Sequence, residues 1–362
     1  MRRRERLRDD TIRAAPVVVS HALSRIALVV LCVALGVPAA QGAPARAVAP
    51  RERADVRVFI DELVRDDGFD RAALQRVFAR VRYRGDVIAA MQRPLVAPPK
   101  WYEYSAQFLT PKRIEAGVRY WDANAEALAQ VEQRFGVPAE IVVAILGVET
   151  FYGRNTGRYR AIDALATLAF DYPRRAAFFR AELRQFLLLA RELGVSPLEA
   201  KGSFAGALGV PQFMPGSYRS YAVDFSGNGR PDLWASAADV VASVANFLAR
   251  HDWQPGQPVL LAAAFPQGLS DDVLRRLDGG ITERRAIEAW AADGVLIADA
   301  PADLPGDPVG VLELEQDGAS GVAARYFIAC NNFYVLTRYN RSRLYAATVW
   351  ELAKAIKAER AR

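Results

Sequence analysis

The stretch AEIVVAILGVET, residues 139–150, places a single glutamate at the end of an apolar helix. Pro138 is expected to open this helix, because proline fits the first positions of a helix, where its missing N–H costs nothing. No polar side chain occurs over residues 141–148, and Glu149 follows directly. The sequence therefore predicts an apolar helix that carries one carboxyl group at its C-terminal end.

The surroundings of Glu149 favour an unusual carboxyl group. Apolar residues precede it, and Phe151 and Tyr152 follow it after one threonine. A carboxylate among such neighbours loses hydration, so its pKa rises. A raised pKa lets the group hold a proton near neutral pH, as the general acid of glycoside cleavage must. A structural glutamate paired with an arginine such as Arg154 is the alternative that these residues alone leave open.

The cysteine and histidine counts remove whole classes of chemistry. Cys32 and Cys330 are the only cysteines of the sequence, and His21 and His251 are the only histidines. If the N-terminal segment is removed, one of each remains, so an intrachain disulfide and a two-histidine zinc motif are both excluded. His251 lies near the end of a predicted helix and is interpreted as a helix-end residue. Any acid–base chemistry therefore falls to carboxyl groups.

Residues 1–42 have the organisation of a secretory signal peptide. An arginine-rich segment ends at Arg25, the apolar run IALVVLCVALGV follows, and small residues come next. This run is too short to span a bilayer core of about 30 Å. We expect cleavage within residues 41–46 and a periplasmic protein, with a buried N-terminal helix as the alternative. A lipid anchor on Cys32 is not expected, because Leu31 precedes it where a small residue is needed.

The charge of the chain argues against a nucleic-acid partner. Of the formal net charge of +6, residues 1–42 carry +4, so the chain without them is only weakly basic. Nucleic-acid binding domains usually carry a strong basic patch. The apolar share of 52% is enough for a real hydrophobic core. We therefore expect a globular protein whose partner is not a nucleic acid.

Hydrophobic periodicity predicts a mainly α fold, of the α+β kind, with a minor antiparallel β element. Residues 43–52 are interpreted as a linker and residues 53–270 as a helical region. Within the helical region we expect helical segments over 53–92, 111–135, 174–193 and 237–250. Residues 271–362 are expected to pack back on the core, with a helix over 275–293, strands over 311–316, 324–330 and 333–339, and a last helix over 342–359.

Four motifs resemble those of the membrane-bound lytic murein transglycosylase B family. They are, in order, GVETFYGRNTGRYRAIDALATLAFDYPRR (147–175), KGSFAGALGVPQFMPGSY (201–218), DFSGNGRPDLW (224–234) and RYNRSRLYAATVWELA (338–353). The resemblance extends from about residue 55 to residue 358. It implies a lysozyme-like catalytic core over about 100–270, with an additional helical domain and a small β element around a deep groove.

The resemblance also implies a reaction on peptidoglycan. One glutamate, here Glu149, protonates the β-1,4 glycosidic oxygen between N-acetylmuramic acid (MurNAc) and N-acetylglucosamine (GlcNAc). It then takes the proton of the C6 hydroxyl, which closes a 1,6-anhydro ring. Two alternatives stay open: a hydrolytic lysozyme-like muramidase that uses Asp163 or Asp171 to place water, and a non-catalytic wall-binding protein. Peptidoglycan strands are the expected partner, with cell-wall synthesis proteins as further candidates.

Substrate-binding residues follow from the same resemblance. Ser203 is expected beside the catalytic glutamate, and Gln212 on an acetamido group. Arg174 and Arg175 are expected near substrate carboxylates, which suit the guanidinium fork. The remaining positions that match the substrate groove are Tyr104, Phe213, Phe247, Tyr339, Asn340 and Tyr345. Phe247 stands where relatives carry tyrosine.

The loop DFSGNGRPDLWA has the spacing of a calcium-binding loop but lacks one ligand. Oxygen ligands are expected from Asp224, Ser226, Asn228 and Asp232. Position twelve of the loop holds Ala235, where a bidentate carboxylate is required. We therefore expect weak calcium binding at most and no required cofactor.

Overall fold

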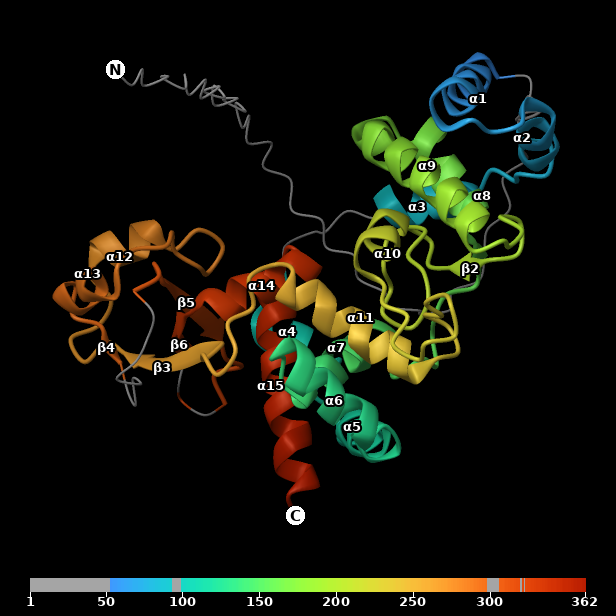
Figure 1. The fold of residues 1–362 in the computed structure, drawn as a ribbon. Helices are drawn as coiled ribbons and strands as arrows, with labels where there is room; N and C mark the ends of the chain where they lie inside the picture. The colour runs from blue at the N-terminus through green and yellow to red at the C-terminus, as the bar shows by residue number, and fades with distance from the viewer. Residues whose placement is uncertain (1–52, 93–98, 298–305, 320, 322) are drawn as a thin grey trace, which may run out of the picture.

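The computed structural model describes residues 53–92, 99–297, 306–319, 321 and 323–362 (Figure 1). The predicted signal peptide (1–42) and linker (43–52) lie outside these residues. Within the described ranges, every helix is too short or too polar to cross a membrane. The expected mainly α fold is confirmed, and its sheets are small and antiparallel.

The centre of the molecule is a bundle built around helix α7 (Ala139–Thr150), as Figure 1 shows. Side chains from Ile141 to Leu146 are all buried, and each such apolar side chain contributes about 1.5–3 kcal/mol by leaving water. The helices that pack directly on α7 are α5 (Pro111–Ala123), α6 (Ala125–Phe135), α11 (Ala237–Ala249) and α15 (Arg343–Arg360). The short α4 (Trp101–Ser105) and α14 (Asn331–Tyr339) pack on α15. The C-terminal residues therefore complete the core around the helix that carries Glu149.

A second group of helices forms the lobe at the upper right of Figure 1. It consists of α1 (Ala54–Asp67), α2 (Arg71–Phe78), α3 (Gly85–Gln92), α8 (Ala161–Asp171), the 3-10 helix η2 (Pro173–Arg175), α9 (Ala176–Glu192) and α10 (Pro215–Tyr221). Helices α8 and α9 form its spine. A two-residue antiparallel pairing joins β1 (Tyr159–Arg160) to β2 (Lys201–Gly202) and ties the start of α8 to the glycine-rich loop that follows β2.

The C-terminal sheet has the antiparallel order β4-β3-β6-β5. Its strands are β3 (Leu260–Ala264), β4 (Leu296–Ile297), β5 (Gly310–Glu315) and β6 (Ala324–Ala329), and it is covered by α12 (Asp271–Arg276) and α13 (Ile287–Ala292). A separate hydrophobic cluster lies beneath these helices around the fully buried Trp290, whose Nε1 donates to the Val309 carbonyl at 2.8 Å. The predicted strands over 311–316 and 324–330 are confirmed.

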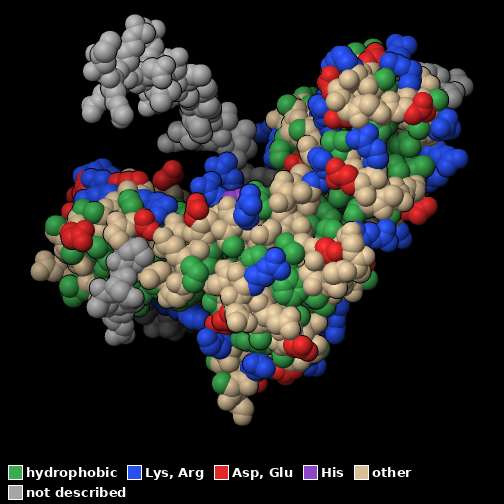
Figure 2. All heavy atoms as spheres, in the orientation of Figure 1, with side chains coloured by type: hydrophobic (Ala, Val, Ile, Leu, Met, Phe, Trp, Pro, Cys, Tyr) green, Lys and Arg blue, Asp and Glu red, His purple; other side chains and the backbone are tan. Residues whose placement is uncertain are grey.

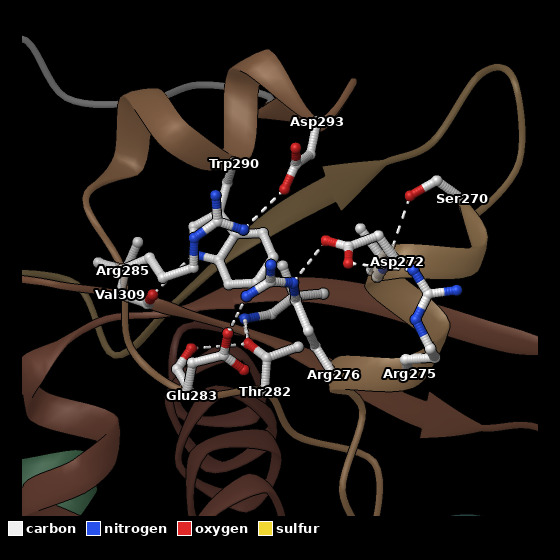
Figure 3. Close-up of polar contacts among 12 residues, drawn as sticks. Ser270, Asp272, Arg275, Arg276, Thr282, Glu283, Arg285, Trp290, Asp293 and Val309 are labelled. Atoms are coloured by element: carbon white, nitrogen blue, oxygen red, sulfur yellow. Dashed lines mark hydrogen bonds and ion pairs between the residues drawn. The ribbon is translucent and has the colours of Figure 1, made fainter.

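The segment between α12 and α13 is irregular instead of helical, and contacts between polar side chains hold it (Figure 3). The prediction of one helix over 275–293 is wrong, because Gly279 and Gly280 have φ of +63° and +85° and turn the chain. Arg276 then bridges Asp272 and Glu283 across the turn. Ion pairs thus hold this irregular segment where helical hydrogen bonds are missing.

Two other predicted elements also differ from the structure. Residues 333–339 form helix α14 rather than a strand, because a short apolar run fits either state and packing decides between them. Phe333 and Leu336, three positions apart, are both buried in the main core. The single helix expected over 111–135 is divided at Asn124, whose backbone leaves the helical region. The domain boundary expected at residue 270 stays a prediction.

Candidate active site

Glu149 lies at the C-terminal end of α7, and the backbone after it is strained. Phe151 and Tyr152 both adopt left-handed conformations, with φ of +51° and +59°, which bulky residues rarely do. The N–H of Tyr152 closes the helix end on the Leu146 carbonyl at 3.0 Å. The Thr150 hydroxyl donates to the Val210 carbonyl at 2.9 Å, and the Tyr152 hydroxyl to the Arg113 carbonyl at 2.9 Å. Neighbouring loops and helices therefore fix the chain on both sides of Glu149.

The carboxyl group of Glu149 is held in a desolvated, aromatic environment. Burial raises its pKa to about 7, and the hydroxyl of Tyr345 opposes this rise by donating to Oε1 at 2.8 Å. The residue keeps some accessible surface. Burial also raises the pKa of Tyr345 well above 10, so its hydroxyl stays protonated and remains a donor. Glu149 can therefore carry a proton near neutral pH and still serve as a base after releasing it.

The aromatic residues predicted to line a groove form a packed cluster beside Glu149. Tyr339 stacks on Tyr345, with ring centroids 6.4 Å apart, and lies 5.8 Å from Phe213 and 4.9 Å from Phe247. Its hydroxyl donates to the Pro211 carbonyl at 2.7 Å. Three of the cluster's rings, those of Phe213, Phe247 and Tyr345, are buried. Only Tyr339 is half-buried, so most of the cluster supports the site from behind instead of offering faces to a sugar.

The two remaining groove positions, Tyr104 and Asn340, also differ from each other in how exposed their side chains are. Tyr104 is buried against Phe108, with ring centroids 5.2 Å apart, and so does not present an open ring face. Asn340 is half-buried, and its Oδ1 atom is buried with no hydrogen-bond partner among the described residues. An unsatisfied acceptor of this kind is costly in a folded protein unless a ligand or water completes it. Asn340 is therefore suited to bind a donor group of a substrate.

Gln212 is fixed so that one particular atom is left for a ligand. Its backbone is left-handed, with φ of +53°. Its side-chain Nε2 donates to the carbonyls of Gly209 at 2.8 Å and Thr156 at 3.1 Å. Both partners only accept hydrogen bonds, which settles that the nitrogen faces them. The Oε1 atom is thus the group that can receive an acetamido N–H, as the sequence predicted for this residue.

Ser203 is buried in the glycine-rich loop, but it is not the hydrogen-bond partner of Glu149 in this structure. Its Oγ accepts from the backbone N–H groups of Ala207 at 3.1 Å and Ala205 at 3.3 Å. The expected orienting contact to the glutamate is supplied by Tyr345 instead. Ser203 organises the turn, and its hydroxyl hydrogen remains available to a neighbouring acceptor.

Arg174 and Arg175 lie on η2, outside the contacts that surround Glu149. Arg174 is exposed, whereas Arg175 is half-buried with its Cζ 4.2 Å from the centroid of the Phe178 ring. The Nη1 atom of Arg175 is buried without a hydrogen-bond partner among the described residues. Burial lowers the pKa of Arg175. Their predicted role in binding carboxylates stays a prediction.

The loop over 224–235 is held together by its own backbone N–H groups. Asp224 accepts from the N–H of Asn228 at 3.0 Å and of Gly229 at 2.7 Å. Asp232 Oδ1 accepts from the N–H groups of Trp234 at 2.8 Å and Ala235 at 3.0 Å. Within the described ranges, no group of three or more Asp, Glu, His or Cys side chains could hold a metal. Asp224 and Asp232 are the two carboxylates that the loop could offer a calcium ion, since Ala235 stands at position twelve, and the expected weak binding stays a prediction.

A buried carboxylate that the sequence did not single out supports this loop. Asp239 is fully buried, and its Oδ1 accepts from the N–H of Phe225 at 2.9 Å and of Ser226 at 2.8 Å. Its Oδ2 accepts from the N–H of Asp232 at 2.9 Å. The backbone N–H of Asp239 also donates to Ser236 Oγ at 3.2 Å, which caps the start of α11. Asp239 thus gathers the two ends of the loop from inside the protein.

The two carboxylates that a hydrolytic mechanism would need are engaged elsewhere. Asp163 is buried in an ion pair with Arg160 at 2.8 Å and also accepts from the N–H of Arg82. Asp171 pairs with Arg53 at 2.5 Å on the surface of the helical lobe. Neither contacts Glu149, whose hydrogen-bond partner is Tyr345. The geometry therefore offers no second carboxylate to activate water next to Glu149 in the part of the chain that the structure describes.

A cavity of about 490 Å³ lies away from Glu149, on another side of the glycine-rich loop. Its lining includes Phe186 and Leu189 of α9, Thr156, and Trp234 at its rim. A concave pocket with apolar walls such as Phe186 and Leu189 is a common place for a ligand to bind. Its lining contains no residue of the Glu149 cluster, so we assign the chemistry by the acid and its partners and not by cavity size.

The sequence matches the family described as "Transglycosylase SLT domain" over residues 51–354. It is also 41% identical over 313 residues to the membrane-bound lytic murein transglycosylase B of Escherichia coli K12. This alignment covers 82% of the present chain and 81% of the Escherichia coli protein. The family match spans all four motifs, which lie within residues 147–353.

Solved structures agree with this relationship. The soluble lytic transglycosylase SltB1 of Pseudomonas aeruginosa superposes with a TM-score of 0.78 at 42% identity, covering 85% of this chain and all of that one. The Escherichia coli enzyme Slt35, solved in complex with calcium, gives 0.76 at 39% identity, covering 86% and 95%. SltB3 of Pseudomonas aeruginosa, solved with NAG-anhNAM-pentapeptide, gives 0.73 at 32% identity, covering 84% and 79%.

Proposed function

The chain belongs to the transglycosylase SLT domain family and is a lytic murein transglycosylase, and from this premise we propose that Glu149 alone performs its acid and base steps. The observation that supports this assignment is the environment of the carboxyl group: it lies beside aromatic rings, burial raises its pKa to about 7, and Tyr345 is its side-chain hydrogen-bond partner among the described residues. An enzyme that uses an internal nucleophile needs only one such group.

In the first step Glu149 acts as an acid. The protonated carboxyl group donates its proton to the glycosidic oxygen between MurNAc and GlcNAc, and the bond from C1 of MurNAc to that oxygen breaks. The electron pair leaves with the GlcNAc oxygen, which becomes a hydroxyl group. C1 gains oxocarbenium character, and Glu149 is left as a carboxylate that the Tyr345 hydroxyl stabilises by its hydrogen bond.

In the second step the same carboxylate acts as a base. It takes the proton of the C6 hydroxyl of the same MurNAc, and O6 forms a bond to C1. The product is a 1,6-anhydro ring, no water is consumed, and Glu149 ends protonated as it began. The desolvated carboxylate is a stronger base than an ordinary glutamate, because a higher pKa for the acid means a higher affinity of its anion for the proton.

We propose that two acceptors, on Gln212 and Asn340, hold the sugar during these steps. Gln212 presents Oε1, because its amide nitrogen is occupied by two backbone carbonyls. Asn340 presents a buried Oδ1 without a protein partner. Both can receive N–H or O–H donors of the N-acetylated sugars. Tyr339 is the one ring of the aromatic cluster that keeps accessible surface beside them.

The products distinguish this reaction from hydrolysis. We expect muropeptides released from purified sacculi to carry 1,6-anhydro-MurNAc ends, which are lighter than reducing ends by one water molecule. Mass spectrometry of the released fragments measures this difference directly. Reducing MurNAc ends as the main primary product would show that water, and not the C6 hydroxyl, attacks C1.

Tyr345→Phe is expected to shift the pH dependence of the reaction. The Tyr345 hydroxyl lowers the pKa of Glu149, so its removal raises that pKa further above 7. The acid then stays protonated to higher pH, and the alkaline limb of kcat/KM moves upward by about half to one pH unit. The limb is measured from pH 5 to 9, with Tyr334→Phe as a control tyrosine. An unchanged or lowered alkaline limb would exclude the proposed influence on the acid.

We infer that the protein works in the periplasm after export. The substrate is a cell-envelope polymer, and residues 1–42 have the pattern of a signal peptide. On the face drawn in Figure 2, basic and acidic side chains are interspersed, which does not suggest a nucleic-acid surface. We expect the mature N-terminus within residues 41–46, as N-terminal sequencing of the exported protein would show. Retention of residues 1–30 would indicate an uncleaved anchor instead.

A further inference from the structure

Two guanidinium groups lie over the phenyl ring of Phe151, two positions after Glu149 in the sequence. The Cζ atoms of Arg113 and Arg154 are 5.0 and 5.2 Å from the centroid of the Phe151 ring. Arg113 is also 5.0 Å from the ring centroid of Phe108, so its guanidinium is sandwiched between two phenyl groups. The left-handed backbone at Phe151 sets the position of this ring.

Neither arginine has an acidic partner among the described residues. Arg113 donates from Nη1 to the Gln107 carbonyl at 2.5 Å, while its Nε atom is buried without a partner. Burial lowers the pKa of Arg113, as expected for a half-buried guanidinium without a carboxylate beside it. Arg113 also occupies the first turn of α5, where a cation opposes the helix dipole. Helix stability therefore does not explain why two cations are placed here.

We propose that Arg113 and Arg154 form an anion site that binds a carboxylate of the peptide stem on the MurNAc residue being cleaved. This role rests on the proposed function of Glu149, because the stem leaves from the same sugar whose C1 reacts. The N-acetylated sugars of a glycan strand are neutral, so the stem carboxylates are the anions that the substrate brings. The planar guanidinium suits a carboxylate in both charge and geometry.

The site should act on binding without changing the acid. Burial and the Tyr345 hydroxyl are the influences that set the pKa of Glu149, and neither arginine is among them. Removing the cations therefore should raise KM on peptide-bearing strands and leave kcat and its pH profile as they were. A residue that only braced the active-site helix would lower kcat or the melting temperature on every substrate.

Calorimetry on a fragment that cannot be cleaved tests the proposal separately from the chemistry. The probe is GlcNAc–MurNAc-tetrapeptide, which lacks the scissile MurNAc–GlcNAc bond. The double variant Arg113→Met with Arg154→Gln keeps an apolar chain between the two rings. We expect its Kd for the probe to rise about tenfold, as expected for the loss of a charge-assisted contact. Arg119→Gln, an exposed arginine on the same helix, is the matched control and should bind as the unmodified protein does.

Two further probes decide what the arginines recognise. The peptide-free disaccharide should bind both proteins equally, and the methyl-esterified tetrapeptide should bind the unmodified protein about as weakly as the double variant binds the free acid. Equal losses on the peptide-free disaccharide, or no loss on the tetrapeptide, would overturn the proposal. Because these probes are not cleaved, a failure of the Glu149 mechanism would leave the binding result unaffected and would be seen only in turnover.

Discussion

Glu149→Gln is expected to reduce turnover on sacculi by about a thousandfold or more, because general acid–base catalysis alone contributes about 10²–10⁴-fold and here one group serves both steps. Glutamine keeps the shape of the side chain and can still accept the Tyr345 hydrogen bond, but it has no proton to transfer. Release of soluble muropeptides from sacculi measures the loss. Glu140→Gln, on the same helix but in an ion pair with Lys357, is the matched control and should keep its activity.

The same variant should be more stable than the unmodified protein at alkaline pH. The pKa of Glu149 is about 7 when folded, against 4.5 for an ordinary glutamate, so ionisation destabilises the folded state as pH rises from about 4.5 through 7. Above pH 7 the glutamine variant avoids this cost, which is at most about 3 kcal/mol. Below pH 4.5 the two proteins should be equally stable. Retained turnover above a few per cent, or a stability gain that does not depend on pH, would contradict the assignment.

Asp239→Asn is expected to lower the free energy of unfolding by about 3 kcal/mol. The carboxylate of Asp239 is fully buried and accepts three backbone N–H groups of the loop over 224–235. In asparagine the amide oxygen can replace one carboxylate oxygen, but the NH₂ group then faces backbone N–H groups, which are also donors. Hydrogen bonds to a charged acceptor are lost, and a buried donor is left unpaired. Chemical unfolding at pH 7 measures the loss. Asp122→Asn, an exposed partner of Arg360, should change stability by less than about 1 kcal/mol.

Calcium provides a second measurement on the same loop. Since Asp239 already gathers the loop and Ala235 supplies no ligand, we propose that the unmodified protein needs no calcium there and gains little stability from it. Binding would stabilise by RT ln(1 + [L]/Kd), which is small unless calcium exceeds Kd. The melting temperature should stay constant at micromolar calcium. An increase of several degrees would show that the loop is a working calcium site. So would an Asp239→Asn variant that reaches the stability of the unmodified protein only when calcium is present.

The local pattern of the chain was enough to predict most of the helices and to single out Glu149 as a candidate acid. The apolar run before Glu149 predicts a buried helix because eight consecutive residues without a polar side chain have no stable place in water. The aromatic residues after it predict a desolvated carboxyl group, and in the fold burial raises the pKa of Glu149 to about 7. Both conclusions depend on neighbours in the sequence, and such neighbours remain neighbours in any fold.

Contacts between distant segments were decided only by the tertiary structure. Tyr345 becomes the hydrogen-bond partner of Glu149 although 196 residues separate them. Arg113 reaches the Phe151 ring only because α5 packs on α7. Residues 333–339 become a helix because packing against the core, and not the ambiguous apolar run, selects their conformation. The sequence by itself thus determined that the carboxyl group of Glu149 has apolar and aromatic neighbours, since these are properties of adjacent side chains. The fold alone decided that the Tyr345 hydroxyl bonds to Glu149 and that Arg113 lies against Phe151, because only long-range packing brings them there.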